Sequence, residues 1–253
     1  MSAPQLPHWP YPRWVAHRGA GKLAPENTLA AFRLGASHGY RMFECDVKLS
    51  QDGVPFLMHD ATLTRTTNAP PSASDIGGDL PWSALSQLDA GGWHSRAYAG
   101  ETLPTLEAIA RYCLRNGHLL NIEIKATPGT ERHTGEVVAK HAARLWHGAA
   151  VAPLLTSFDV ASLEGAQAAE PALPRGLLLD ELWSGWLDTA LRLGCQAIVC
   201  NHVLWSQDTV AQAKNAGLRT LCYTVNDAAA AQRLIDLGTD CIITDRVDLF
   251  SPA

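Results

Sequence analysis

The sequence predicts an α/β protein, a (β/α)8 TIM barrel with a small insertion between the second strand and the second helix. Short apolar runs recur along the 253 residues, and segments with helical periodicity separate them. Strands that alternate with helices are typical of a parallel sheet. Eight such units in about 250 residues fit a closed barrel. An open doubly wound sheet is the alternative, but neither GxGxxG nor GxxxxGKS/T occurs in the chain.

The expected strands are short apolar segments, and the expected helices lie between them. The strands are predicted at residues 13–17, 41–46, 119–124, 151–156, 174–179, 197–201, 219–224 and 240–244. The helices are predicted at residues 27–38, 105–116, 130–146, 159–169, 184–193, 206–216 and 227–237. Several of them begin at a residue suited to an N-cap, such as Asn27 or Thr105, and several end at a glycine. Only residues 247–250 remain to cover the last strand.

The interval between the second and third expected strands is much longer than the others. It contains a short strand-like run at residues 54–59, followed by a segment rich in Pro, Gly, Ser and Asp. We interpret residues 60–103, approximately, as an insertion on a single domain that spans residues 1–253. Loops that follow barrel strands lie at the face where active sites are found, so the insertion is expected to overhang the site.

Composition and charge exclude several classes of protein. Apolar residues make up 47% of the chain and charged residues 18%, as in an ordinary globular protein. The net charge of −5 and the absence of a basic stripe argue against a nucleic-acid partner. No apolar run approaches the roughly 18 residues of a membrane span, so no stable membrane association is expected. The sequence does not indicate an oligomeric state.

The cysteines and the N-terminus indicate a cytoplasmic protein. None of the six cysteines forms a CxxC pair, and most lie in strand-like apolar runs, where a free thiol packs as a small hydrophobe. The first twelve residues contain four prolines and no apolar stretch typical of a secretory signal. We therefore expect reduced, structural cysteines and a cytoplasmic location.

Three carboxylates are predicted to meet inside the barrel. Glu44 and Asp46 alternate along one expected strand and share a face, as do Glu123 and Lys125 on the next. Carboxylates at close range repel one another strongly in a low dielectric. A divalent cation removes that repulsion, and oxygen ligands favour Mg²⁺ or Ca²⁺. The alternative is that Glu123 pairs only with Lys125 while the other two carboxylates are solvated.

Two histidines and an arginine stand beside this acidic group. His17 and His59 each follow an expected strand, and Arg18 follows His17 directly. Two histidines can divide acid and base work near neutral pH. The planar guanidinium of arginine suits a phosphate. Together these residues indicate phosphoryl chemistry with water as the final acceptor.

The sequence resembles the bacterial, cytoplasmic-type glycerophosphodiester phosphodiesterase family in a set of ordered motifs. Each motif alone is weak, but they follow one another in family order over nearly the whole chain. The stretches are AHRG at 16–19, APENT at 24–28, ECDV at 44–47, DGVPFLMHD at 52–60, TLTRTTN at 62–68, LPTLEA at 103–108, NIEIK at 121–125, SFD at 157–159, YTVN at 223–226 and IITD at 242–245.

The resemblance implies hydrolysis of a small glycerophosphodiester to sn-glycerol 3-phosphate and an alcohol. By matching motifs, the metal ligands would be Glu44, Asp46 and Glu123, the general acid and base His17 and His59, and the phosphate-binding residues Arg18 and Lys125. The glycerol would lie near Tyr223, which stands where the family usually has Trp. Asn27 and Thr28 are interpreted as a helix cap that braces His17. The first nucleophile is either water or the 2-hydroxyl of the substrate.

Two other functions remain open at this point. The chain could resemble a phosphoinositide phospholipase C or a sphingomyelinase D, with Trp183 and Trp186 forming an apolar rim around the site. A non-catalytic module that binds glycerophosphodiesters is the other alternative, but it would be expected to lack a histidine or carboxylate that this chain retains.

Overall fold

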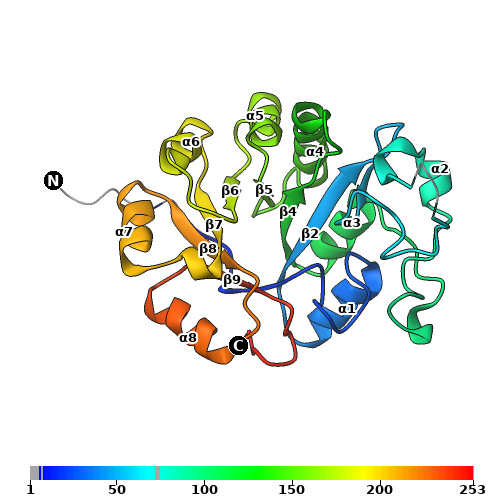
Figure 1. Cartoon of the computed structure of the whole chain (residues 1–253), viewed down its shortest axis with the longest axis horizontal. Coiled ribbons are helices and arrows are strands. Elements are labelled where there is room, and N and C mark those ends of the chain that lie inside the picture. The colour runs from blue at the N-terminus through cyan, green and yellow to red at the C-terminus, as the bar shows by residue number, and fades with distance from the viewer. Residues whose placement is uncertain (1–5, 7, 72–74, 253) are drawn as a thin grey trace.

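Eight parallel strands close on themselves in the structure, a computed structural model that describes residues 6, 8–71 and 75–252. The order of the sheet is β1-β9-β8-β7-β6-β5-β4-β2-β3, and pairing of β1 with β2 completes the ring. Helices surround the strands (Figure 1), so the predicted TIM barrel is confirmed. The ninth strand, β3, pairs antiparallel with β2 and lies outside the ring.

The strands and helices alternate in the predicted order. The strands are β1 (Trp14–Ala16), β2 (Met42–Leu49), β3 (Pro55–Leu57), β4 (Leu119–Ile124), β5 (Leu154–Ser157), β6 (Arg175–Leu179), β7 (Ala197–Asn201), β8 (Arg219–Tyr223) and β9 (Cys241–Thr244). The α-helices are α1 (Leu29–Ser37), α2 (Trp82–Leu85), α3 (Leu106–Arg115), α4 (Glu131–Leu145), α5 (Val160–Ala169), α6 (Trp186–Arg192), α7 (Gln207–Asn215) and α8 (Ala228–Asp236).

The alternation of side chains along each strand divides the core into an inner and an outer layer. Ten buried residues form a cluster, called here the lumen cluster, that draws on seven of the ring strands and on no helix. It includes Leu178 and Ile243, and it fills the lower part of the barrel. The residues that alternate with these along the strands, such as Cys45 and Ile198, pack outward against the helices. All six cysteines are free and buried, as expected.

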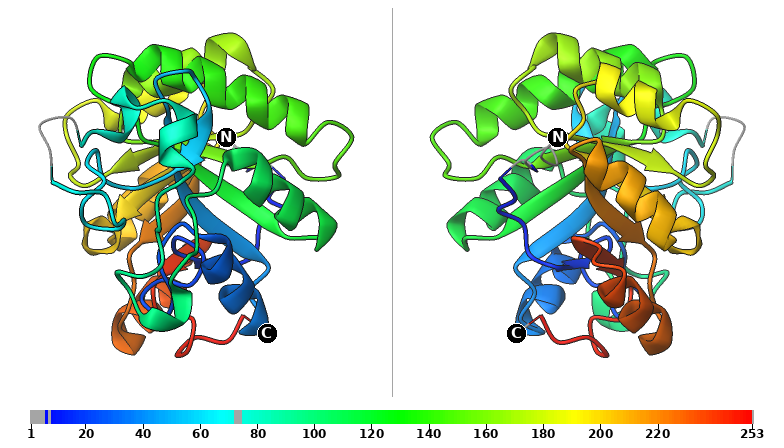
Figure 2. Two further views of the ribbon diagram at one scale, coloured as in Figure 1. Left: turned by 90° about the vertical axis from the view of Figure 1, so that its right-hand side faces the viewer. Right: turned by 90° about the vertical axis from the view of Figure 1, so that its left-hand side faces the viewer.

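The predicted insertion is built on a small core of its own. It follows β3, contains α2 and two short 3-10 helices, Gly77–Asp79 and Arg96–Tyr98, and leads into α3. Phe56, Met58 and Leu85 are fully buried beneath it. In Figure 2 this cyan-to-green segment lies against one side of the barrel. Three of its residues, Arg65, Trp93 and His94, line a second cavity that shares His17 and Arg18 with the candidate site described below.

The start of the first helix differs from the prediction in one respect. Thr28, not Asn27, is the N-cap, and its Oγ1 accepts a hydrogen bond from the backbone N–H of Ala31. Asn27 is buried and lies in the left-handed region with φ 60°. Its side chain turns back to the strand β2, where it contacts Asp46. Its interpretation as a helix cap is therefore wrong.

The last strand is covered without a further helix among the described residues. Val247 is buried, and Phe250 stacks on Trp14 with 4.6 Å between the ring centroids. In the part of the chain that the structure describes, no helix is both long enough and apolar enough to cross a membrane.

Candidate active site

The residues predicted to form the site meet in one cavity at the carboxyl ends of the barrel strands. The cavity has a volume of about 170 Å³, and Leu178 and Ile243 of the lumen cluster form its floor. Seven of the eight predicted site residues line it; the eighth, Asp46, is buried beside Glu123 on the neighbouring strand. The lining residues are His17, Arg18, Glu44, His59, Asn121, Glu123, Lys125, Phe158, Leu178, Tyr223, Thr224 and Ile243.

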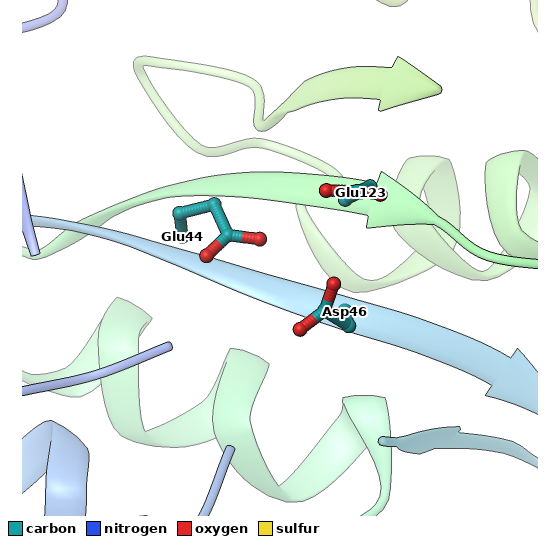
Figure 3. Close-up of side chains that lie close together, drawn as sticks. All are labelled: Glu44, Asp46 and Glu123. Carbon is teal, nitrogen blue, oxygen red and sulfur yellow. The ribbon is translucent and has the colours of Figure 1, made fainter. Parts of the chain in front are cut away.

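Glu44 and Asp46 of β2 form an acidic cluster with Glu123 of β4. The register of the two strands pairs Asp46 with Glu123, which brings the carboxyl groups to one level of the barrel (Figure 3). One oxygen from each side chain lies within 4.8 Å of the others. Glu44 and Asp46 are only 2% and 1% exposed, so the alternative in which they are solvated is wrong.

The oxygens of this acidic cluster fit a divalent cation. Glu44 Oε1 and Asp46 Oδ1 are buried and have no hydrogen-bond partner among the described residues. A buried carboxylate oxygen without a partner carries a large desolvation cost. A cation held between the three carboxylates removes that cost, and a set of carboxylate oxygens suits a hard ion such as Mg²⁺ or Ca²⁺.

Burial and mutual repulsion divide the protons unequally within the cluster. Burial, together with the negative charge of Asp46, raises the pKa of Glu44 to about 8 and also raises the pKa of Glu123. Burial acts on Asp46 in the same direction, but the positive charge of Arg18 and other nearby cations outweighs it and lowers the pKa of Asp46. Asp46 therefore carries its charge near neutral pH, whereas Glu44 holds a proton that a bound cation would have to displace.

Arg18 occupies a strained turn directly after β1. Its φ of 50° lies in the left-handed region, which costs a non-glycine residue about 1–3 kcal/mol. Three carboxylates hold it there. Its backbone N–H donates to Glu44 Oε2 (3.0 Å), and Nη1 donates to Glu26 Oε1 (2.9 Å). Its Nε lies 3.3 Å from Asp46 Oδ2, an ion pair without hydrogen-bond alignment.

Asn27 positions the most buried carboxylate of the acidic cluster. Its Nδ2 donates to Asp46 Oδ2 at 2.7 Å, and its Oδ1 accepts from the backbone N–H of Asp46 at 3.1 Å. Of the described non-glycine residues, only Arg18 and Asn27 have positive φ, and both contact Asp46. The strain in this loop is therefore concentrated where it positions the carboxylates.

His17 is held by a carboxylate from the opposite end of the sequence. Its Nδ1 lies 2.7 Å from Asp245 Oδ1, while Asn226 Nδ2 donates to Asp245 Oδ2 at 2.8 Å. A Cβ at Gly21 would lie 2.2 Å from the Asp245 Cα, so only glycine permits this approach of the two loops. Burial lowers the pKa of His17, but the hydrogen bond that its Nδ1–H donates to Asp245 and the charge of Glu44 outweigh it and raise that pKa.

His59 has the same arrangement with a different carboxylate. Its Nδ1 lies 2.8 Å from Oδ1 of the adjacent Asp60, which also accepts hydrogen bonds from Arg65. Arg65 in turn donates from both Nη atoms to Glu26. Burial lowers the pKa of His59, and the charge of Asp46 offsets that effect only in part. In both histidines an aspartate binds Nδ1, so the other ring nitrogen, Nε2, does not contact that aspartate.

Lys125 and two aromatic side chains complete the far wall of the cavity. Lys125 Nζ donates to Glu123 Oε1 at 2.9 Å and lies 5.7 Å from the ring centroid of Phe158. Phe158 packs edge-on against Tyr223, whose hydroxyl donates to the Leu179 carbonyl at 2.9 Å. Tyr223 thus has its polar group occupied and presents its ring to the cavity.

Several residues of this network were not assigned a role from the sequence. Asp245, Asn226 and Asp60 belong to the motifs IITD, YTVN and the HD pair, so their place beside strand ends was the available signal. Arg65 lies in the insertion, so the motif TLTRTTN at 62–68 was its available signal, without a strand end beside it. The apolar rim of the alternative lipid phosphodiesterase is not found at Trp186, which is buried in the core between the barrel and the helices.

A parallel barrel with its polar cavity at the carboxyl ends of the strands defines the class of (β/α)8-barrel enzymes. Within that class, the chain belongs to the glycerophosphoryl diester phosphodiesterase family, whose model matches residues 17–249. The protein is therefore a phosphoric diester hydrolase, and the resemblance seen in the sequence is confirmed.

Individual relatives match over nearly their full length. A glycerophosphodiester phosphodiesterase of Caldanaerobacter subterraneus is 31% identical, with 91% of this chain and 93% of the relative covered. The solved structure of an Oleispira antarctica phosphodiesterase in complex with the product sn-glycerol-3-phosphate has a TM-score of 0.86 and 33% identity, covering 92% and 93% of the two chains. A glycerophosphodiester phosphodiesterase from Agrobacterium tumefaciens has a TM-score of 0.79 and 30% identity, covering 96% and 100%.

Proposed function

We propose that the protein hydrolyses glycerophosphodiesters to sn-glycerol 3-phosphate and an alcohol, with a divalent cation at the acidic cluster and proton transfer by His17 and His59. The observation that carries the proposal is that the acidic cluster, with its two buried and unpartnered carboxylate oxygens, borders the cavity that both histidines line. The Oleispira antarctica relative, whose structure holds sn-glycerol-3-phosphate, supports the identity of the product.

Arg18 and Lys125 are proposed to bind the phosphate from opposite sides of the cavity. Each has N–H groups that its ion pairs with carboxylates do not use, and each lines the cavity beside the acidic cluster. Their charges are partly neutralised by Glu26 and Glu123. The two cations therefore orient a phosphodiester, which carries a single negative charge, without holding it too tightly for product release.

His17 and His59 are proposed to exchange protons with the substrate through Nε2. One imidazole accepts the proton of the attacking hydroxyl, and the other donates a proton to the oxygen of the leaving alcohol. Asp245 and Asp60 keep each ring in the tautomer that this exchange needs, because each carboxylate accepts the Nδ1–H. Closely placed aspartates also stabilise the imidazolium that forms during the transfer.

The acidic cluster supplies the place for the cation. Glu44, Asp46 and Glu123 would hold it, and the bound ion would withdraw charge from the phosphoryl oxygens as negative charge develops. Asn27 and Lys125 keep two of these carboxylates oriented by hydrogen bonds of 2.7 and 2.9 Å. The ligand set does not distinguish Mg²⁺ from Ca²⁺, since both accept carboxylate oxygens.

Turnover of soluble glycerophosphodiesters tests the proposal. Purified protein is stripped with chelator, its metal content is verified by elemental analysis, and release of sn-glycerol 3-phosphate is measured with and without Mg²⁺ or Ca²⁺. We expect activity only with added cation, and a severe loss in Glu44→Gln. The matched control is Glu181→Gln, at an exposed position far along the chain. Full activity of verified metal-free protein would contradict the role of the cation. If no glycerophosphodiester yields sn-glycerol 3-phosphate, the proposed function is wrong.

A further inference from the structure

A second cavity lies directly beside the first and shares His17 and Arg18 with it. It has a volume of about 460 Å³, and it runs between the loop at residues 17–26 and the insertion. The His94 ring joins these two segments, with Nε2 lying 3.0 Å from the Lys22 carbonyl oxygen. Figure 2 shows the insertion packed against this side of the barrel. We call this second cavity the outer pocket.

The outer pocket is placed where the leaving alcohol must go. The attacking and leaving oxygens of a phosphoryl transfer lie roughly in line on opposite sides of phosphorus. The first cavity, at about 170 Å³, equals only about six water volumes, so a glycerol and a phosphate would leave no room in it for a head group. With phosphate at the boundary formed by His17 and Arg18, a glycerol in the first cavity directs the opposite substituent into the outer pocket.

We propose that the outer pocket is the subsite for the head group, and that it selects uncharged or anionic polyols over cationic amines. This inference rests on the proposed function, because it concerns the alcohol that the same hydrolysis releases. The charges that face the pocket, and one aromatic ring, carry the argument.

The carboxylates of the outer pocket are already occupied. Glu26 accepts three hydrogen bonds, one from Arg18 and two from Arg65. Asp245 accepts from His17 through one oxygen and from Asn226 through the other. A cationic head group entering the pocket would therefore find no carboxylate free to pair with it.

The ammonium group of Lys22 in the outer pocket is, in contrast, available to a head group. Lys22 is exposed and lines the pocket, and its ammonium forms no ion pair or hydrogen bond with any of the described residues. An ammonium offers three donors and no acceptor. Hydroxyl and phosphate oxygens can accept those donors, whereas choline or ethanolamine would be repelled by the like charge.

Trp93 provides a fixed apolar wall of the same pocket. It is 41% exposed, yet its Nε1 donates to the Ala90 carbonyl at 2.9 Å and its ring packs edge-on against His94. Asp89 orders the same loop by accepting from the backbone N–H groups of Gly91, Gly92 and Gly100. The negative face of an indole attracts the electropositive C–H groups of a cyclic polyol. The ring thus favours inositol over the smaller glycerol.

The test compares head groups in the holoenzyme and in one charge-reversal variant. The readout is the ratio of kcat/KM for glycerophosphoinositol to that for glycerophosphocholine. We expect this ratio to exceed one in the wild type and to fall at least about tenfold in Lys22→Glu, because a hydrogen bond from a charged donor is lost and a carboxylate becomes free to pair with choline. Lys140→Glu, an exposed lysine on α4, is the matched control and should leave the ratio unchanged.

A second variant tests the aromatic wall. Trp93→Leu should lower kcat/KM for glycerophosphoinositol about three- to tenfold relative to glycerophosphoglycerol, since an aromatic contact of this kind is worth a factor of that size. If both substrates turn over but neither variant moves its ratio, the head-group subsite is wrong while the proposed function stands. If the wild type cleaves no glycerophosphodiester at all, the proposed function is wrong and the subsite falls with it.

Discussion

Asp245 and His17 are 228 residues apart in the sequence, and Asp245 Oδ1 lies 2.7 Å from His17 Nδ1. Closure of the barrel produces this contact. The first and last strands, β1 and β9, are parallel neighbours, with Ala16 paired to Thr244, so the residue after each strand emerges at the same place. The chain thus uses the seam of its barrel to orient one of its two site histidines.

The first prediction is that Asp245→Asn lowers kcat about 10- to 100-fold, which is part of the 10²–10⁴-fold that an acid–base group contributes. An amide cannot hold the Nδ1–H tautomer of His17 or stabilise its imidazolium. The hydrogen bond that His17 donates to Asp245 raises the pKa of His17, so its loss should also move one limb of the pH–kcat profile to lower pH.

The shift of the pH profile separates this role from a purely structural one. Damage to packing would lower kcat without moving either limb. Asp248→Asn is the matched control, because that exposed carboxylate pairs with Arg246 and lies three residues further on. Wild-type pH limbs in Asp245→Asn would contradict the positioning role.

The barrel and its order of elements could be predicted because they depend on short-range patterns. Apolar runs, caps and glycine ends repeat along the chain, and each strand was expected within a few residues of its observed place. The outward packing of Cys45, and the shared level of Asp46 and Glu123, follow from alternation along parallel strands. These features need no knowledge of which loops meet.

The partners of the site residues could not be predicted, because they depend on contacts between loops. Asn27 occupies the position expected of a helix cap, yet its side chain turns to Asp46, since the left-handed backbone aims it at the barrel. Arg65 reaches Glu26 from the insertion across 39 residues of sequence. The periodicity of one chain segment carries no information on contacts between loops that are far apart in the sequence.

The second prediction concerns the two histidines together. His17→Ala and His59→Ala should each reduce kcat about 10²–10⁴-fold, since each removes one partner of the proton exchange. The double variant should lose less than the product of the two single losses, because residues that act as a unit are not additive. His133→Ala, an exposed histidine on α4, is the control. Turnover within a few-fold of wild type in either single variant would assign that histidine a structural role.

The third prediction links the cation to pH through Glu44. Burial and Asp46 raise the pKa of Glu44 from 4.5 to about 8, so the protein without cation holds a proton there at about pH 7. Binding of Mg²⁺ or Ca²⁺ must displace it. We expect release of close to one proton per cation at about pH 7, and release that declines toward zero above about pH 9. Calorimetric titration in buffers of different ionisation enthalpy measures this number directly.

The stability of the cation-free protein should depend on the same protonation of Glu44. The folded state binds it more tightly than the unfolded chain, so this group's contribution to the free energy of unfolding falls as pH rises from about 4.5 to about 8. In Glu44→Gln that decline should be missing, and added cation should no longer raise the melting temperature. Parallel pH–stability curves for wild type and variant would contradict the raised pKa.

The last prediction asks which oxygen attacks phosphorus first. The 2-hydroxyl of the glycerol is tethered beside phosphorus, so its attack avoids the entropy cost of capturing a water. We predict that it attacks: the bond from the 2-oxygen to phosphorus forms, the bond to the head-group oxygen breaks, and His17 and His59 accept one proton and donate the other. Water then opens the five-membered cyclic phosphate to give sn-glycerol 3-phosphate. A substrate that lacks only this hydroxyl, 3-hydroxypropyl phosphocholine, should inhibit competitively and remain uncleaved, whereas hydrolysis at a rate comparable to that of glycerophosphocholine would make water the first nucleophile.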